Sequence, residues 1–147
     1  MKEALIALFE RDIDKLATEL SLYANEHDIW ALKGEISNSA GNLCLHLIGN
    51  LNHFIGAVLG ETGYLRNREA EFSTKDVSIA HILTQIEATK ATVTGTLQNL
   101  STEDMDQDFP VAFLGKVSKT GYVLLHLLSH LSYHLGQINY HRRLVSS

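Results

Sequence analysis

Apolar residues recur at intervals of three and four along several long stretches of the chain, which is the spacing of amphipathic helices. No stretch shows the sustained alternation of apolar and polar residues that is typical of a strand. The chain contains a single proline, Pro110, and it lies in a stretch that looks irregular. We therefore predict an all-α fold in which four long helices pack as an antiparallel four-helix bundle.

The helical period is found in four parts of the chain: residues 3–25, 43–60, 78–97 and 120–144. Residues suited to N-caps precede the second and third of these, with Asp76 or Ser78 as the cap of the third. The connections between the helices are long, so the sequence leaves the up-and-down order of the bundle open. Residues 61–72 are expected to form a polar connection. Residues 101–121 are expected to be irregular, with a short hairpin possible at 110–117.

Length, charge and cysteine content limit the class of protein. The 147 residues fit one domain, residues 1–147. Twelve basic against seventeen acidic residues give a net charge of −5, which argues against nucleic acid or an anionic membrane as partner. No apolar run is expected to approach the ~20 residues that span a bilayer. The lone Cys44 cannot form an intramolecular disulfide, so a cytoplasmic protein is the expectation.

Half of the eight histidines lie in the last predicted helix. A helix turns by about 100° per residue, so five polar side chains share one stripe about 80° wide. These are His126, His130, His134, Gln137 and His141. The stripe borders the apolar face formed by the leucines of the same helix. This is where a bundle would place a half-buried site.

The second predicted helix carries a matching polar stripe. Asn42, Asn50 and His53 all fall within about 40° of His46 on the same helical projection. A polar stripe inside an otherwise apolar helix is unfavourable unless its groups find partners. Two such stripes on two helices could therefore satisfy one another or share a ligand.

A metal ion shared by the two polar stripes is a more specific interpretation than hydrogen bonding between them. Two imidazoles at positions i and i+4 can chelate one ion, and a third from a facing helix would leave an open coordination position, as in catalytic sites. One alternative is a closed, non-catalytic site in which His53 or His126 adds a fourth ligand. The other is a metal-free bundle whose histidines only make hydrogen bonds.

Two segments resemble a known family. "HLSYHLGQ" (130–137) fits the His-x-x-x-His-x-Gly-Gln signature of the DinB-like metal-binding superfamily, and "CLHLIGNLNHFIGAVLG" (44–60) is similar to its second helix. The resemblance extends over essentially the whole chain, although the better-understood thiol-dependent members are less similar. It implies a four-helix bundle with unusual connectivity, a homodimer, and a three-histidine site for a divalent ion, with zinc or nickel favoured.

The resemblance also implies which residues act. By position in the motifs, the metal ligands would be His46, His130 and His134, with His53 as the fallback for His46. His126, Gln137 and Asn50 would be hydrogen-bonding neighbours or alternative ligands. Arg66 and Arg68 are candidate contacts for a substrate anion, because a guanidinium pairs with a carboxylate through two N–H groups. The favoured alternative is a solvated loop in which these arginines pair with Glu69 or Glu71.

The expected function follows from the family. Some members, such as bacillithiol S-transferases and mycothiol-dependent maleylpyruvate isomerase, use the metal to activate a low-molecular-weight thiol. The chain is therefore expected to be a metal-dependent S-transferase that conjugates a small-molecule thiol to small electrophiles. The alternatives are a metal-dependent hydrolase, or a non-catalytic metal-binding dimer with a stress-response or interaction role.

Overall fold

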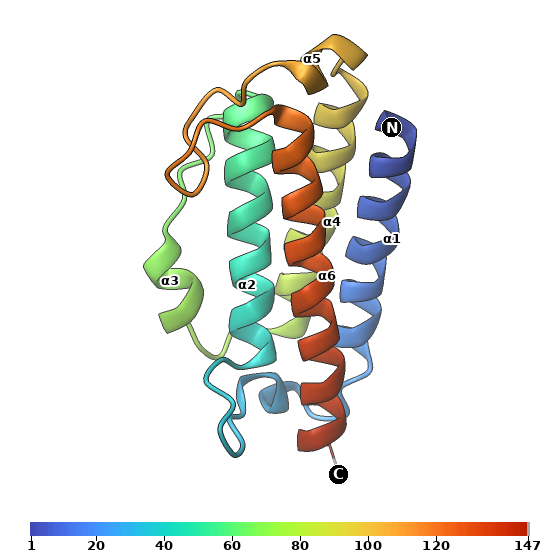
Figure 1. Cartoon of the computed structure of the whole chain (residues 1–147). Helices are drawn as coiled ribbons and strands as arrows, with labels where there is room; N and C mark the ends of the chain where they lie inside the picture. The colour runs from blue at the N-terminus through green and yellow to red at the C-terminus, as the bar shows by residue number, and fades with distance from the viewer. Residues whose placement is uncertain (147) are drawn as a thin grey trace.

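Four long helices pack side by side around one apolar core in the computed structural model, which describes residues 1–146 (Figure 1). They are α1 (Lys2–Ser21), α2 (Ala40–Leu51) with its π-helical continuation η2 (Asn52–Leu59), α4 (Ile79–Gln98) and α6 (Thr120–Val145). Shorter pieces lie between them: the 3₁₀-helix η1 (Glu26–Trp30), α3 (Arg68–Ser73) and α5 (Thr102–Asp106). The predicted all-α fold is confirmed.

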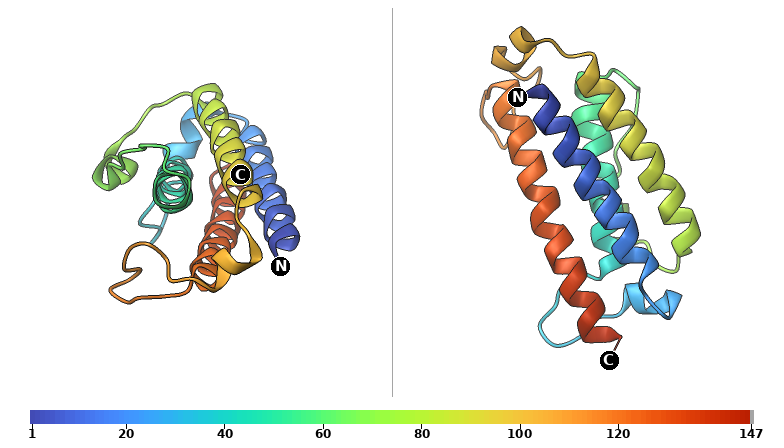
Figure 2. Two further views of the ribbon diagram at one scale, coloured as in Figure 1. Left: turned by 90° about the horizontal axis from the view of Figure 1, so that it is seen from above. Right: turned by 90° about the vertical axis from the view of Figure 1, so that its right-hand side faces the viewer.

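The direction of the helices differs from the simple antiparallel expectation. Lys2 of α1 donates to the carbonyl of Gln98 at the end of α4, so these two helices run in opposite directions. Glu19 of α1 pairs with Arg142 at a distance of 2.8 Å, so α1 and α6 run in the same direction. The neighbours α2 and α4 also run parallel to each other (Figures 1 and 2).

The parallel direction of α2 and α4 explains why the connection between them is long. Because α2 and α4 point the same way, the chain must return along the full length of the bundle between them. Residues 60–78 make this return, and we call them the crossover segment. Seen end-on, α3 of this segment lies outside the ring of long helices and beside α2 (Figure 2).

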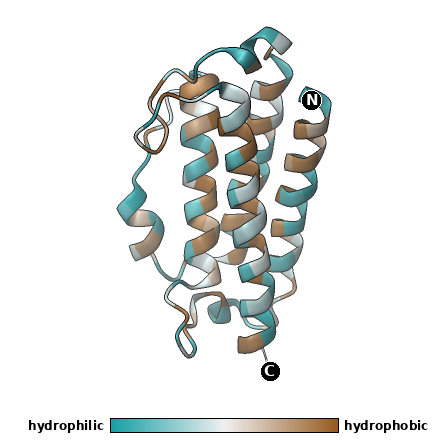
Figure 3. Cartoon of the chain, in the orientation of Figure 1, coloured by the Kyte–Doolittle hydropathy of each residue, from teal (hydrophilic) through white to brown (hydrophobic). Residues whose placement is uncertain are grey.

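The interior of the bundle is built from the apolar stripes that the sequence predicts. In α1 the side chains at intervals of three and four are at most 2% exposed: Leu5, Phe9, Ile13, Leu16 and Leu20. Each such burial stabilises the fold by about 1.5–3 kcal/mol. Apolar and polar residues alternate around the long helices accordingly (Figure 3).

The helix starts follow the predicted capping chemistry. Ser78 is the N-cap of α4, and its side chain accepts a hydrogen bond from the His81 amide. Asp76, the other candidate, lies two residues earlier in a left-handed conformation with φ of 62°. α2 begins in the same way, because the Ser39 side chain accepts from the Asn42 amide.

The second helix corrects one expectation. Ala40–Leu59 is a continuous 20-residue helix whose length and apolar composition would allow it to cross a membrane, whereas no run of this kind was expected. It contains no Asp, Glu, Lys or Arg, and its polar side chains are those of histidine and asparagine. In the structure 61% of this stretch is buried inside the bundle, which is the pattern of a core helix.

The connection at 101–121 is more ordered than predicted. It begins with α5, which starts in a capping box formed by Ser101 and Asp104. The chain then pairs with itself through isolated bridges, one of them between Phe113 and Lys116. Leu114 and Gly115 between these two residues have φ of 50° and 78°, as a type I′ hairpin turn requires. The possible hairpin is therefore present, centred on residues 114–115.

Candidate metal centre

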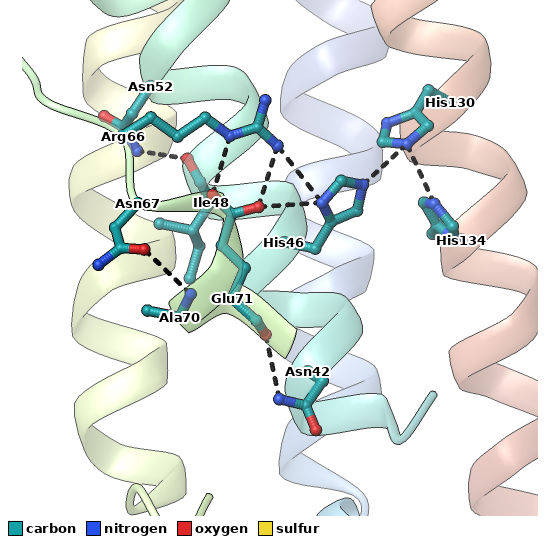
Figure 4. Close-up of polar contacts among 10 residues, drawn as sticks. All are labelled: Asn42, His46, Ile48, Asn52, Arg66, Asn67, Ala70, Glu71, His130 and His134. Atoms are coloured by element: carbon teal, nitrogen blue, oxygen red, sulfur yellow. Dashed lines mark hydrogen bonds and ion pairs between the residues drawn. The ribbon is translucent and has the colours of Figure 1, made fainter. Parts of the chain in front are cut away.

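Three histidines from two helices meet at one point (Figure 4). His46 lies on α2, and His130 and His134 lie one turn apart on α6, which runs antiparallel to α2. The Nε2 atom of His130 is 3.1 Å from Nε2 of His46 and 3.0 Å from Nε2 of His134. One ligand atom from each ring lies within 4.8 Å of the other two. The structure thus brings together the three ligands that the family resemblance implies.

Hydrogen bonds at the far sides of two rings fix where their protons lie. His46 Nδ1 is 3.0 Å from Glu71 Oε1, and His134 Nδ1 is 2.7 Å from Gln137 Oε1. A carboxylate or an amide oxygen only accepts, so Nδ1 donates in both contacts. Arg66 Nη2 is also 3.4 Å from His46 Nδ1, but it donates to Glu71 Oε1 at the shorter distance of 2.9 Å. Each neutral ring then carries its lone pair on Nε2. Both lone pairs therefore face the Nε2 atom of His130.

His130 cannot satisfy both of these lone pairs. If its proton is on Nε2, it donates to one neighbour and leaves the other unpaired. If its proton is on Nδ1, three lone pairs face each other, and Nδ1 is itself buried without a partner in the described part of the chain. A cation can accept all three lone pairs at once. The donor set therefore fits a first-row divalent ion.

Burial favours the neutral, metal-binding form of His130 and His46. It lowers the pKa of His130 to about 4, with smaller contributions from His134 and His46. Burial also lowers the pKa of His46, although the hydrogen bond to Glu71 acts in the opposite direction. Metal binding competes with protonation of an imidazole, so a lowered pKa reduces that competition near neutral pH.

These pKa shifts predict how the stability of the metal-free protein depends on pH. An unfolded histidine has a pKa of about 6.5, whereas folded His130 and His46 have lower pKa values. Below that pH the unfolded chain therefore binds protons that these two folded histidines do not bind. The free energy of unfolding should therefore fall as the pH drops from about 7 to 5. Urea midpoints in chelator-treated buffer measure it, and His130→Ala should weaken the dependence. An unchanged pH dependence in that variant would contradict the assignment.

A buried carboxylate supports the site from the crossover segment. Glu71 is 6% exposed, and Arg66 binds it through two N–H groups, Nε to Oε2 and Nη2 to Oε1, each at 2.9 Å. Gly49 of α2 makes room for this carboxylate, because a Cβ at that position would overlap it. The Glu71 side chain thus lies between His46 and Arg66 (Figure 4).

Both arginines proposed as substrate contacts have protein neighbours. Arg66 directs two of its N–H groups at Glu71, so these are already used within the protein. Arg68 is exposed on α3 and lies over the Phe72 ring, 5.2 Å from its centroid. Neither arrangement places an unused guanidinium fork at the histidines.

The other histidines of the two stripes lie outside the group. His53 packs on Phe54 with ring centroids 4.7 Å apart, and His126 packs on Phe113 at 5.0 Å. His53 lies seven residues after His46, at the start of the π-helix η2, and a rise of about 1.5 Å per residue places it about 10 Å further along the helix axis. Within residues 1–146 no fourth histidine, cysteine or acidic ligand atom joins the group. The fourth ligand of the closed alternative is thus not supplied.

Two further polar residues differ in role. Asn50, one turn after His46, is 7% exposed, and its Oδ1 has no hydrogen-bond partner in the described chain. His141 is buried and makes two hydrogen bonds of 2.7 Å, to the Tyr23 hydroxyl and the Ala31 carbonyl. His141 therefore joins the C-terminal part of α6 to the chain on both sides of η1.

Sequence reasoning considered Glu71 only as a possible ion-pair partner of Arg66 or Arg68 and missed its contact with His46. It lies in a polar stretch that was predicted as a connection and that forms the six-residue helix α3. The available signals were weak. Asn67 is a suitable N-cap and indeed accepts from the Ala70 amide, and Gly49 interrupts an apolar helix three residues after His46.

A family model described as "Protein of unknown function (DUF1572)" matches residues 3–147, which is nearly the whole chain. No curated protein matches significantly.

Proposed function

The chain belongs to the DUF1572 family, a DinB-like helical family, and from this premise we propose that it binds one divalent transition-metal ion through His46, His130 and His134. The observation that carries the proposal is the convergence of three Nε2 atoms, two of which have their lone pairs fixed by hydrogen bonds at Nδ1. Zinc or nickel is the proposed ion, since imidazole is a good ligand for both.

The proposal extends to catalysis because three protein ligands leave a coordination position open. An ion held there would supply Lewis acidity, which lowers the pKa of a thiol or water in the open position. Of the three ligands His46 is buried, whereas His130 and His134 are only partly buried. A small molecule could therefore approach from the side of α6.

We propose S-transfer as the reaction, on the strength of the DinB-like resemblance together with the open position. The sulfur of a small thiol would lose its proton to solvent and form a bond to an electrophilic carbon, while the bond from that carbon to its leaving group breaks and the leaving group departs as an anion with the bonding electron pair. A cytoplasmic homodimer is the proposed setting. Hydrolysis by an activated water is the chemical alternative, and metal binding without turnover is the non-enzymatic one.

The binding claim is tested by metal content. Protein prepared without a histidine tag should be stripped with chelator, reloaded with Zn²⁺ or Ni²⁺, freed of excess ion and analysed for metal. We expect one ion per chain. A substoichiometric result with both ions would overturn the proposal.

The activity claim needs a separate assay. Loaded protein should be assayed for conjugation of bacillithiol, glutathione or coenzyme A to a chromogenic electrophile, with stripped protein as the control. A parallel ester-hydrolysis assay without thiol tests the hydrolase alternative. If the loaded protein is inactive in both assays, the transferase proposal falls and only metal binding stands.

A further inference from the structure

A carboxylate of the crossover segment is built into the candidate metal centre. We propose that Glu71 is a positioning residue that aims His46 at the ion and couples the docking of the crossover segment to metal binding. This inference rests on the proposed metal site. It assigns a role to a residue that does not itself belong to the ligand group.

Glu71 fixes the orientation of the His46 ring. Glu71 Oε1 accepts from His46 Nδ1 at 3.0 Å, on the side of the ring opposite the Nε2 atom that faces His130 (Figure 4). This contact selects the Nδ1–H tautomer and holds the plane of the ring. A carboxylate partner also raises the basicity of the imidazole, which strengthens its bond to a metal.

Helix α2 is shaped to admit this carboxylate. Gly49 lies three residues after His46, and a Cβ at that position would overlap Glu71 Oε2. A glycine in a helix interior is unfavourable by roughly 0.5–1 kcal/mol relative to alanine. At Gly49 a glycine is nevertheless required, because any side chain there would occupy the space of the Glu71 carboxylate.

Polar contacts hold the crossover segment against α2. Asn42 Nδ2 donates to the carbonyls of Glu71 at 3.0 Å and Thr74 at 2.8 Å. Between this segment and the helices α2 and α4 lies a cavity of about 310 Å³, lined among others by Tyr64 and Gln85. The segment is therefore fastened by polar contacts around Glu71 rather than by continuous apolar packing. Because coupling free energies are reciprocal, an ion that favours the His46–Glu71 contact also favours the docked segment.

The decisive experiment compares the metal affinities of the wild type, Glu71→Ala and Glu71→Gln. Affinity is measured by competition with a chromophoric chelator, under conditions where circular dichroism shows that both variants are folded. We expect Glu71→Ala to weaken binding roughly 10–100-fold, the range for loss of an outer hydrogen-bond partner. Glu71→Gln keeps an acceptor oxygen and should recover part of the loss. A purely structural role would lower stability in both variants and leave the affinity of the folded protein unchanged.

A glycine pair provides an independent variant with a matched control. Gly49→Ala should displace the Glu71 carboxylate and weaken metal binding in the same direction as Glu71→Ala. Gly95→Ala, in the interior of α4 where nothing lies within 4 Å of the new Cβ, should leave affinity unchanged. In the Glu71→Ala background, Gly49→Ala should add little further loss, because the two changes act on one contact.

Two readouts report the contact itself. In the Co²⁺-loaded protein, the exchangeable Nδ1–H resonance of His46 should be slow to exchange in the wild type and lost in Glu71→Ala. Metal loading should slow amide exchange in residues 61–74 of the wild type but not of the variant. If the wild type binds no ion, the site and this inference both fall. If it binds and the Glu71 variants bind equally well, only the inference falls.

Discussion

Replacing His130 with alanine is expected to abolish stoichiometric metal binding. Its Nε2 atom is the one that lies within about 3 Å of both other ligand atoms, so its loss leaves two imidazoles on different helices. A structural zinc site is worth about 10–16 kcal/mol over four ligands, so one ligand contributes on the order of 2.5–4 kcal/mol, or roughly 70- to 900-fold in affinity.

A histidine one turn earlier on the same helix serves as the control. His126 packs against Phe113 and lies outside the ligand group, so His126→Ala should keep one ion per chain. Metal content after reloading and a chelator competition assay measure both variants. Retention of a full equivalent by His130→Ala would overturn the ligand assignment, and equal loss in both variants would indicate a general loss of structure instead.

The sequence predicted those parts of the site that depend on helical spacing. His130 and His134 are one turn apart, so any α-helix through them places both rings on one face. The stripe centred on His46 was found in the same way, and the buried positions of α1 follow the apolar spacing from Leu5 to Leu20. These features need only local geometry, which residue spacing determines.

Spacing could not predict the features that are set by contacts between distant segments. Glu71 reaches His46 only because α2 and α4 run parallel and the chain returns along α2. Helical spacing carries no information on that direction. The angle of His53 on the stripe does not show which turn of the second helix meets the histidines of α6, and His53 lies about 10 Å along the axis from His46.

Replacing Arg66 with methionine is expected to destabilise the metal-free protein by about 3 kcal/mol. Glu71 is buried and its partner Arg66 is partly buried, so removing Arg66 leaves a buried carboxylate without its counter-charge, and the cost lies near the lower end of the roughly 3–5 kcal/mol for a broken buried pair. Arg68→Met is the matched control, since Arg68 is exposed and should change stability by no more than about 0.5 kcal/mol. The double variant Arg66→Met/Glu71→Gln should recover much of the loss because it removes the unpaired charge.

Adding metal tests whether Arg66 stabilises the protein through its positive charge or by holding the Glu71 side chain in position. A divalent ion held by Nε2 of His46 would lie across the imidazole from Glu71, where its positive charge can replace that of the missing guanidinium. Zinc should therefore stabilise Arg66→Met more than it stabilises the wild type, and the affinity for zinc should be equal or higher in the variant. Urea unfolding with and without zinc, at matched ratios of free ion to dissociation constant, measures this difference. A drop in affinity like that of Glu71→Ala would contradict the charge argument and show that Arg66 acts by holding the Glu71 carboxylate in place.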